Sequence, residues 1–188
     1  MAHLILSIIF VFYGSFNTPS TISQSSNFNQ GKKYAVGDEA FGGIIIYLDP
    51  TGEHGVVCAL KDETLAGKDR MVWGCLDTYI SGSRGTAIGA GEQNTKDIVN
   101  TCTKGVTAAD VCSKSRQGGY TDWYLPSKGE LNAIYKLKKK GRLKMKKTGY
   151  WSSTGTGDGN AWVQTFGMGF QFISAKYGSH KVRPVRKF

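Results

Sequence analysis

The segment GYTDWYLPSKGEL at residues 119–131 constrains the fold more than any other part of this chain. It places Ser127 and Glu130 three residues apart, directly before a run with helical apolar spacing. This is the spacing of a capping box, in which each side chain accepts a hydrogen bond from the other residue's backbone N–H. The sequence therefore predicts a helix over residues 128–139. Its buried face is expected to contain Leu131, Ile134, Tyr135 and Leu137.

Earlier in the chain, two apolar runs at residues 44–48 and 55–60 flank the turn sequence Asp-Pro-Thr-Gly. Two such runs across a turn containing Pro and Gly predict a β-hairpin. Residues 61–91 are rich in Gly, Ser and Thr and show no clear periodicity, which favours a long structured loop region.

Apolar spacing predicts two further helices before the capped one. The first covers about residues 95–103 with Asn94 or Thr95 as N-cap. The second contains Ala108, Ala109, Val111 and Cys112 and is expected to end before Gly118 and Gly119. After residue 148 the alternation of apolar residues predicts a small antiparallel sheet. Pro184 lacks a backbone N–H, so the final strand is expected to lie at a sheet edge or to meet its neighbour through Val182 and Val185 only.

Several sequence blocks occur in a fixed order. The capping segment is followed by GYWSST at residues 149–154, AWVQTF at 161–166 and VRPVRKF at 182–188. It is preceded by FGGIIIYLDPTGEHG at residues 41–55, WGC at 73–75 and TAIGAGEQNT at 86–95. Together these blocks resemble the C-terminal domain of the Legionella collagen-like (Lcl) protein family, over about residues 36–188. The agreement of several blocks in order makes the resemblance specific.

The resemblance implies a C-type-lectin-like α+β fold, related to that of formylglycine-generating enzymes. Such a fold has small antiparallel sheets, two or three short helices and long glycine-rich loops. The family consists of bacterial secreted and surface modules used mostly for binding. The resemblance therefore specifies the fold more firmly than the function.

The first 31 residues contain no Lys, Arg, Asp or Glu, and residues 4–16 are nearly all apolar. This apolar run is shorter than the roughly 20 residues of a membrane span and suits a signal peptide. We therefore expect a signal peptide at residues 1–23, a flexible linker at 24–33 and one domain at 34–188, in a secreted or surface-exposed protein. An uncleaved anchor or a misassigned start remains the alternative, because no Lys or Arg precedes the apolar run.

The chain has four cysteines, Cys58, Cys75, Cys102 and Cys112, and none of them forms a C-x-x-C pair. That spacing argues against zinc and thioredoxin-like sites and favours disulfides in an exported protein. The short separation of Cys102 and Cys112 predicts that they pair, stabilising the fold by about 2–3 kcal/mol. By elimination Cys58 would pair with Cys75. If residues 1–23 are not a signal peptide, the alternative is four reduced, partly buried thiols.

The positive charge is concentrated in one segment. The chain has a net charge of +10, and residues 136–147 supply eight cations and no acid, leaving +2 for the rest. The eight candidates for polyanion binding are Lys136, Lys138, Lys139, Lys140, Arg142, Lys144, Lys146 and Lys147. Their mutual repulsion favours an anionic partner, with strongly salt-dependent binding. The alternative is a solvated loop that aids solubility.

The Lcl-type domain is associated with binding of sulfated glycosaminoglycans. Here the basic segment resembles an insertion between the matching blocks, so it is not carried over as the family's site. We expect an adhesin-like binding module for a polyanionic polysaccharide or another cell-surface ligand, with its oligomeric state open. The alternatives are a structural module of a surface assembly and a protein-binding scaffold that varies over residues 171–181.

Other side chains are weaker candidates. Three loop residues are candidate ligand contacts: Trp73, Tyr177 and His180. The remaining tryptophans, Trp123, Trp151 and Trp162, are expected to pack in the core. Arg183 and Arg186 are expected to pair with acids such as Asp122 or Glu130 rather than with a ligand.

The sequence does not predict a cofactor, a metal site or an enzyme. The sugar-binding calcium signatures of lectins are missing, with Asp158 and Asn160 as the only loose candidates. No cysteine follows Cys112, which argues against formylglycine-generating activity. The three histidines lie far apart in sequence, and none has a nucleophile or acid at motif spacing.

Overall fold

The computed structural model describes residues 33–157 and 159–188. The predicted signal peptide and all but the last residue of the predicted linker lie outside these residues. Their prediction stays a prediction.

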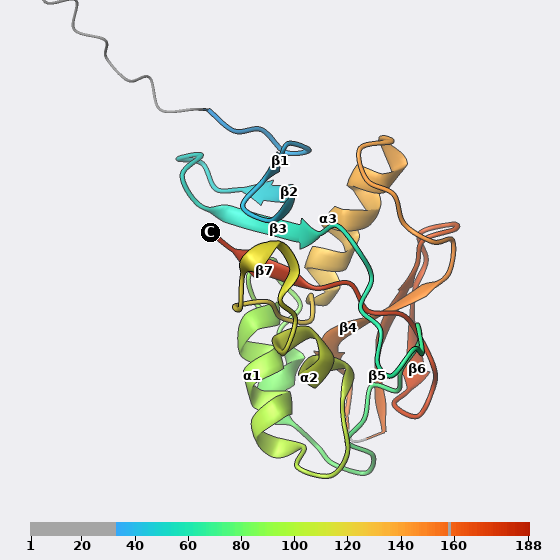
Figure 1. Ribbon diagram of the computed structural model, residues 1–188. Helices are drawn as coiled ribbons and strands as arrows, with labels where there is room; N and C mark the ends of the chain where they lie inside the picture. Colours follow the sequence, from blue (N-terminus) through green and yellow to red (C-terminus); the bar gives the residue numbers. More distant parts are fainter. Residues whose placement is uncertain (1–32, 158) are drawn as a thin grey trace, which may run out of the picture. The chain divides into compact units, whose positions relative to one another are not determined.

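The described domain contains two small antiparallel sheets (Figure 1). The first has the order β1-β2-β3-β7. Its strands are β1 (Glu39–Ala40), β2 (Gly43–Leu48), β3 (Gly55–Ala59) and β7 (Val185–Lys187). The β2–β3 pair confirms the predicted hairpin, and Asp49 holds its turn by accepting the backbone N–H groups of Thr51 and Gly52. Strand β7 follows Pro184 and lies at the sheet edge, as predicted.

The second sheet has the order β4-β5-β6 and confirms the sheet predicted from alternation. Its strands are β4 (Gly149–Gly155), β5 (Asn160–Thr165) and β6 (Gln171–Ala175). Strand β4 is buried along its whole length, whereas β6 lies at an edge of the sheet and is largely accessible.

Three α-helices and two short 3-10 helices complete the described part of the chain. They are α1 (Gly91–Thr101), α2 (Ala108–Ser113), α3 (Lys128–Lys139), η1 (Ser81–Arg84) and η2 (Gln117–Gly119). Helix α3 has the predicted bounds, and Ser127 and Glu130 form the predicted capping box. Helix α1 begins at Gly91, before the residue predicted from the sequence, and its N-cap residue Ala90 has no side-chain cap.

Helix α3 joins the two sheets. Its buried residues Leu131, Ile134 and Leu137 share one apolar cluster with β2, β3 and β4. A second cluster lies between α1, α2 and the β4–β5 pair, with Ile98, Cys112 and Trp151 among its members. In Figure 1, α1 and α2 lie at the opposite end of the domain from the C-terminal end of α3.

The architecture is α+β with two small antiparallel sheets and three helices, as expected, and it is consistent with a C-type-lectin-like fold. Within residues 33–157 and 159–188, no helix is long and apolar enough to cross a membrane.

Candidate anion-binding surface

The basic segment covers the last turn of α3 and the loop that leads to β4. The capping box fixes where α3 begins, and Gly141, with a φ of +74°, reverses the chain after its last turn. The Gly141 N–H donates to the Lys138 carbonyl at 2.9 Å, and the Arg142 N–H donates to the Leu137 carbonyl at 3.2 Å. Leu143 is buried and anchors the loop on the core. The cations are therefore held on an ordered surface.

The end of the loop is fixed by a chain of polar contacts. The Lys146 N–H donates to the Tyr150 hydroxyl at 3.2 Å, and that hydroxyl donates to Asp62 at 2.9 Å. Asp62 also accepts from Arg183, 2.7 Å from the arginine Nε. Burial raises the pKa of Tyr150, and the neighbouring Asp62 charge adds to that increase, so the phenol stays protonated. The loop is thus tied to a buried ion pair.

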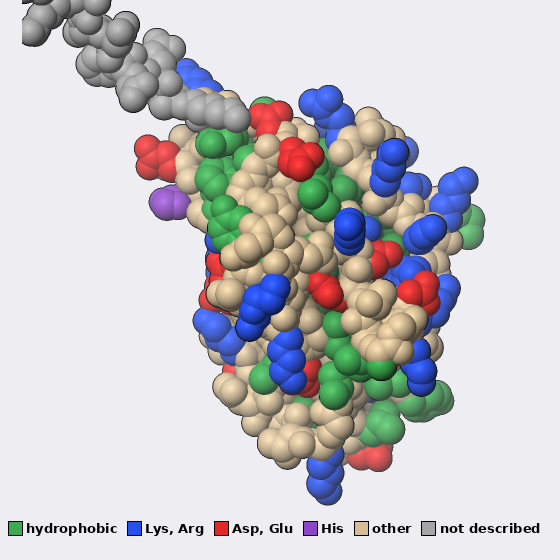
Figure 2. All heavy atoms as spheres, in the orientation of Figure 1, with side chains coloured by type: hydrophobic (Ala, Val, Ile, Leu, Met, Phe, Trp, Pro, Cys, Tyr) green, Lys and Arg blue, Asp and Glu red, His purple; other side chains and the backbone are tan. Residues whose placement is uncertain are grey.

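Seven of the eight basic side chains are exposed and Lys138 is half-buried. Lys138 donates from Nζ to the Phe166 carbonyl at 2.8 Å. Among the described residues, none of the eight forms an ion pair with a carboxylate. Figure 2 shows Lys and Arg side chains gathered over the end of α3 and the loop beyond it. The structure therefore places the eight cations at the end of α3 and in the loop that follows it, with seven of them exposed.

Two acids near the end of the basic loop, Asp62 and Asp69, are already paired. Asp62 contacts Arg183 and lies 3.7 Å from the Lys181 Nζ, and Asp69 binds the same Nζ. The hydrogen bond from Lys181 lowers the pKa of Asp69. The partial negative charge at the C-terminus of α3 offsets only the cations of its last turn.

A shallow groove of about 420 Å³ runs beside α3 and reaches two of these cations, Lys136 and Lys140. Its other lining residues include Val36, Ile88, Asn132 and Ala133. No acid lines it, so the groove offers an anion two cations one helical turn apart on a partly apolar floor.

The structure contradicts the prediction that Trp73 contacts a ligand. Trp73 is only 1% exposed, and its indole N–H donates to the Ser152 carbonyl at 2.8 Å. The glycine-rich sequence around it indicated a loop, but the loop folds inward and its tryptophan fills the core. Trp123 and Trp151 are buried as expected, and Trp162 is half-buried under the Lys128 ammonium.

The other two loop candidates differ from each other. Tyr177 is 71% exposed and lines a cavity of about 600 Å³ beside the disulfide. His180 is half-buried, packs edge-on against Trp151 and lies 3.1 Å from the Ser174 hydroxyl. Burial lowers the pKa of His180, and the neighbouring Arg70 lowers it further. Neither residue lies in the basic segment.

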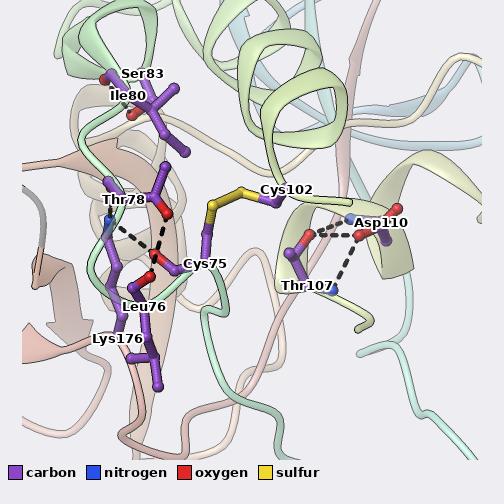
Figure 3. The surroundings of a disulfide bond; sticks show 9 residues. All are labelled: Cys75, Leu76, Thr78, Ile80, Ser83, Cys102, Thr107, Asp110 and Lys176. Atoms are coloured by element: carbon purple, nitrogen blue, oxygen red, sulfur yellow. Dashed lines mark hydrogen bonds between the residues drawn. A yellow bond between two sulfur atoms is a disulfide. The ribbon is translucent and has the colours of Figure 1, made fainter. Parts of the chain in front are cut away.

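The predicted disulfide pairing is wrong. Cys75 bonds to Cys102 (Figure 3). Cys58 and Cys112 are free and buried. Cys102 caps the end of α1, and the loop at Gly74 and Cys75 approaches it through positive φ angles. Cys112 faces the core from α2 and Cys58 lies in β3, so each is enclosed in a different apolar cluster. Burial raises the pKa of the Cys58 thiol to about 12.

Figure 3 also shows what surrounds the disulfide. The Lys176 ammonium donates to the Thr78 carbonyl at 2.8 Å and to the Cys75 carbonyl at 3.3 Å. Thr107 and Asp110 form a second capping box at the start of α2. The sequence reasoning missed this box, although Thr107 and Asp110 have the same spacing as Ser127 and Glu130.

The expected arginine pairing is confirmed for Asp122. Arg186 donates to both Asp122 oxygens, at 2.6 and 2.8 Å, and Arg183 pairs with Asp62. Glu130 instead completes the α3 cap and accepts from the Tyr124 hydroxyl. Of the loose calcium candidates, Asp158 lies outside the described residues. In the described part of the chain, no three His, Cys, Asp or Glu side chains cluster as metal ligands would.

Comparison with known families identifies one match. The family model described as the Lcl C-terminal domain matches residues 68–186. This range is narrower than the one over which the sequence blocks agree, since it omits β1, β2 and β3 and includes only the first two residues of β7. No curated protein matches the chain.

Proposed function

We propose that this chain, which belongs to the Lcl C-terminal domain family, binds polyanionic glycans through residues 136–147. Membership of the family indicates a surface or secreted module. The Cys75–Cys102 disulfide is consistent with an oxidising compartment outside the cytoplasm. The glycan-binding, adhesin-like role is the proposal.

One observation supports the role above all others. Seven exposed cations lie in a segment of twelve residues, and none is paired with a carboxylate of the described chain. Holding these like charges close together opposes folding, because the cations repel one another. A function in anion binding would explain why the segment carries them. An anionic polymer with regularly spaced charges would relieve that repulsion along the whole segment.

The test is retention on immobilised heparin, used as a sulfated polysaccharide probe. The variant carries Lys139→Ser, Lys140→Ser, Arg142→Ser and Lys144→Ser, and it spares Lys138 because that side chain binds the Phe166 carbonyl. We expect the wild type to be retained at low salt and the variant to elute at much lower salt. Loss of four contacts should reduce the slope of log K against log salt by roughly three to four.

A matched control removes the same charge elsewhere. It carries Lys61→Ser, Lys68→Ser, Lys104→Ser and Lys114→Ser, all at exposed positions outside the basic segment. Retention close to that of the wild type would support a local site. Equal loss in the two variants would show that net charge alone drives retention, and would contradict the proposal.

A protein-binding scaffold is the second candidate, favoured by the exposure of Ile173 and Tyr177 within residues 171–181. Lys176 and Lys181, however, are buried in the same segment and hydrogen-bonded to surrounding groups. Free variation of this segment would therefore disrupt the core at two positions. We favour the glycan-binding role for this reason.

Binding without catalysis is also part of the proposal. His180 contacts a serine hydroxyl and an indole ring, not an acid that could orient it as a general base. The two free cysteines are buried, and burial raises their pKa values, which disfavours the nucleophilic thiolate. Incubation with heparin oligosaccharides should leave their chain length and sulfation unchanged, and any cleavage would contradict this part of the proposal.

A further inference from the structure

The turn between β5 and β6 exposes apolar side chains that the proposed glycan site does not use. Met168 is 72% exposed and Phe170 is 63% exposed. They are followed along the edge strand β6 by Phe172 and Ile173, which are also exposed. A contiguous exposed apolar surface on a small domain indicates an interaction site more often than isolated apolar residues do.

The turn has a defined backbone. The Gly169 N–H donates to the Thr165 carbonyl at 2.9 Å, and the Thr165 N–H donates to the Phe170 carbonyl at 2.8 Å. Gly169 has a φ of +87°, and a Cβ there would collide with the Tyr135 ring. Met168 and Phe170 are therefore presented on a fixed turn that packs against α3.

The basic segment lies beside this turn. Lys138 donates to the carbonyl of Phe166, and the Phe166 N–H donates to the Thr148 carbonyl at 2.9 Å. A Cβ at Gly167 would lie 3.8 Å from the Lys147 Cβ. In Figure 1 the loop after α3 descends next to the β5–β6 turn. The apolar turn therefore adjoins the basic segment at Lys138 and Lys147.

We propose that this surface docks on an anionic phospholipid bilayer, with Met168 and Phe170 inserted among the acyl chains. The cations would then lie at the depth of the phosphate groups. A soluble polysaccharide would neutralise the cations but leave the apolar turn in water, whereas a bilayer interface satisfies both. A second copy of the chain fits less well, because it would bring two strongly positive surfaces together.

This inference shares its cations with the proposed glycan site but depends on two apolar side chains that the glycan site does not need. The discriminating variant carries Met168→Ser and Phe170→Ser. The control carries Leu65→Ser and Leu76→Ser, which removes exposed apolar side chains far from the basic segment in sequence.

The experiment is flotation with phosphatidylcholine vesicles, with and without phosphatidylglycerol, at low and high salt. We expect the wild type to bind only the anionic vesicles and to dissociate at high salt. The Met168/Phe170 variant should bind them about tenfold or more weakly, because two apolar side chains no longer leave water. Its heparin retention should be unchanged, and the control should bind both probes like the wild type.

A Phe170→Trp variant provides a second measurement that keeps the aromatic side chain. Its additional fluorescence should shift to shorter wavelength with anionic vesicles and should be quenched by brominated acyl chains. The proposal is overturned if the wild type ignores anionic vesicles, or if the Met168/Phe170 and control variants bind alike. A lower oligomeric state of the Met168/Phe170 variant, with vesicle binding intact, would instead assign the turn to contacts between copies. The glycan proposal is judged separately, by whether the variant with Ser at Lys139, Lys140, Arg142 and Lys144 loses heparin retention while its charge-matched control does not.

Discussion

Single residues at helix starts set much of the local structure. Ser127 accepts the Glu130 N–H, and Glu130 accepts the Ser127 N–H at 2.7 Å. Glu130 is fully buried, and desolvation raises its pKa although its hydrogen bonds favour the carboxylate. The same residue accepts from Gly89 and Tyr124, so the capping group of α3 also holds the loop before α1.

Replacement of Ser127 by Ala should destabilise the domain by about 1–2 kcal/mol, because a buried N-cap hydroxyl is lost. The hydroxyl also donates to the Ala87 carbonyl at 2.7 Å, which places the cost toward the upper end. The measurement is the free energy of unfolding in urea. Ser179→Ala, at an exposed position, is the control and should change that free energy by less than about 0.5 kcal/mol.

His180 should make stability depend on pH. Its pKa in the folded protein lies below the usual 6.5, chiefly because of burial, so the unfolded chain binds the proton more tightly. Its contribution to stability is complete above pH 6.5 and is lost as the pH falls toward the folded-state pKa. The free energy of unfolding should therefore fall as the pH is lowered from above 6.5 toward the folded-state pKa of His180.

A His180→Asn variant tests this assignment. Its free energy of unfolding should fall less over the same pH range, because Asn does not titrate. Parallel curves for the wild type and the variant would assign the pH dependence to other groups.

At the scale of elements, local sequence patterns predict the helix bounds and turns that nearby side chains determine. They do not predict those that depend on tertiary contacts. The bounds of α3 and the β2–β3 turn follow from nearby side chains, and both were predicted correctly. The start of α1 has no side-chain cap and depends on contacts with the distant Glu130 region, including close approach of Gly91. No local pattern could locate that start.

The disulfide shows the same limit. Sequence separation favoured Cys102 with Cys112, but Cys112 faces the core from α2, while Cys75 reaches Cys102 through a loop with left-handed backbone. Such a loop path depends on packing of Trp73 and Lys176, which sequence spacing does not encode. The sequence also predicts wrongly that Trp73 contacts a ligand, because spacing does not show that its loop packs into the core.

Thiol titration should distinguish the observed pairing from four reduced cysteines. The native protein should show no rapidly reacting thiol, because Cys58 and Cys112 are buried. Unfolded without reductant it should show two, and after reduction four. Four reactive thiols before reduction would contradict the Cys75–Cys102 bond.

The same bond should contribute measurably to stability. It closes a loop with a sequence separation of 27 residues, for which chain entropy gives about 3–4 kcal/mol. A Cys75→Ser/Cys102→Ser variant should lose stability of that order in urea unfolding. A Cys58→Ser variant controls for loss of a thiol without loss of a bond.

At the scale of the whole molecule, the sequence locates the eight cations but does not predict which residues surround them. The eight cations lie within twelve residues of sequence, so any ordered structure of that segment keeps them near one another. The neighbouring apolar turn belongs to another hairpin. It reaches the basic segment through tertiary contacts, in which Phe166 bonds to the Thr148 carbonyl and to the Lys138 ammonium. The same holds for β7, whose pairing with β3 joins residues near opposite ends of the domain.

Arg183 links these distant parts. It donates to Asp62 and to the Ala59 and Leu60 carbonyls, while Asp62 also accepts from Tyr150, which holds the end of the basic loop. An Arg183→Met variant keeps much of the apolar volume but leaves the Asp62 carboxylate mostly buried beside only Tyr150 and Lys181. Breaking one partner of such a pair should cost about 3–5 kcal/mol in the free energy of unfolding.

An Asp62→Asn change in the Arg183→Met background should recover part of that loss, because it removes the uncompensated charge rather than adding a contact. The loop end should respond as well: hydrogen exchange of the Lys146 amide should accelerate in Arg183→Met, since its acceptor Tyr150 loses a fixed partner. The exchange of amides in α1, far from this network, serves as the internal reference. A cost below about 1 kcal/mol, with unchanged exchange at Lys146, would show that β7 pairing and apolar packing hold the domain together without this ion pair.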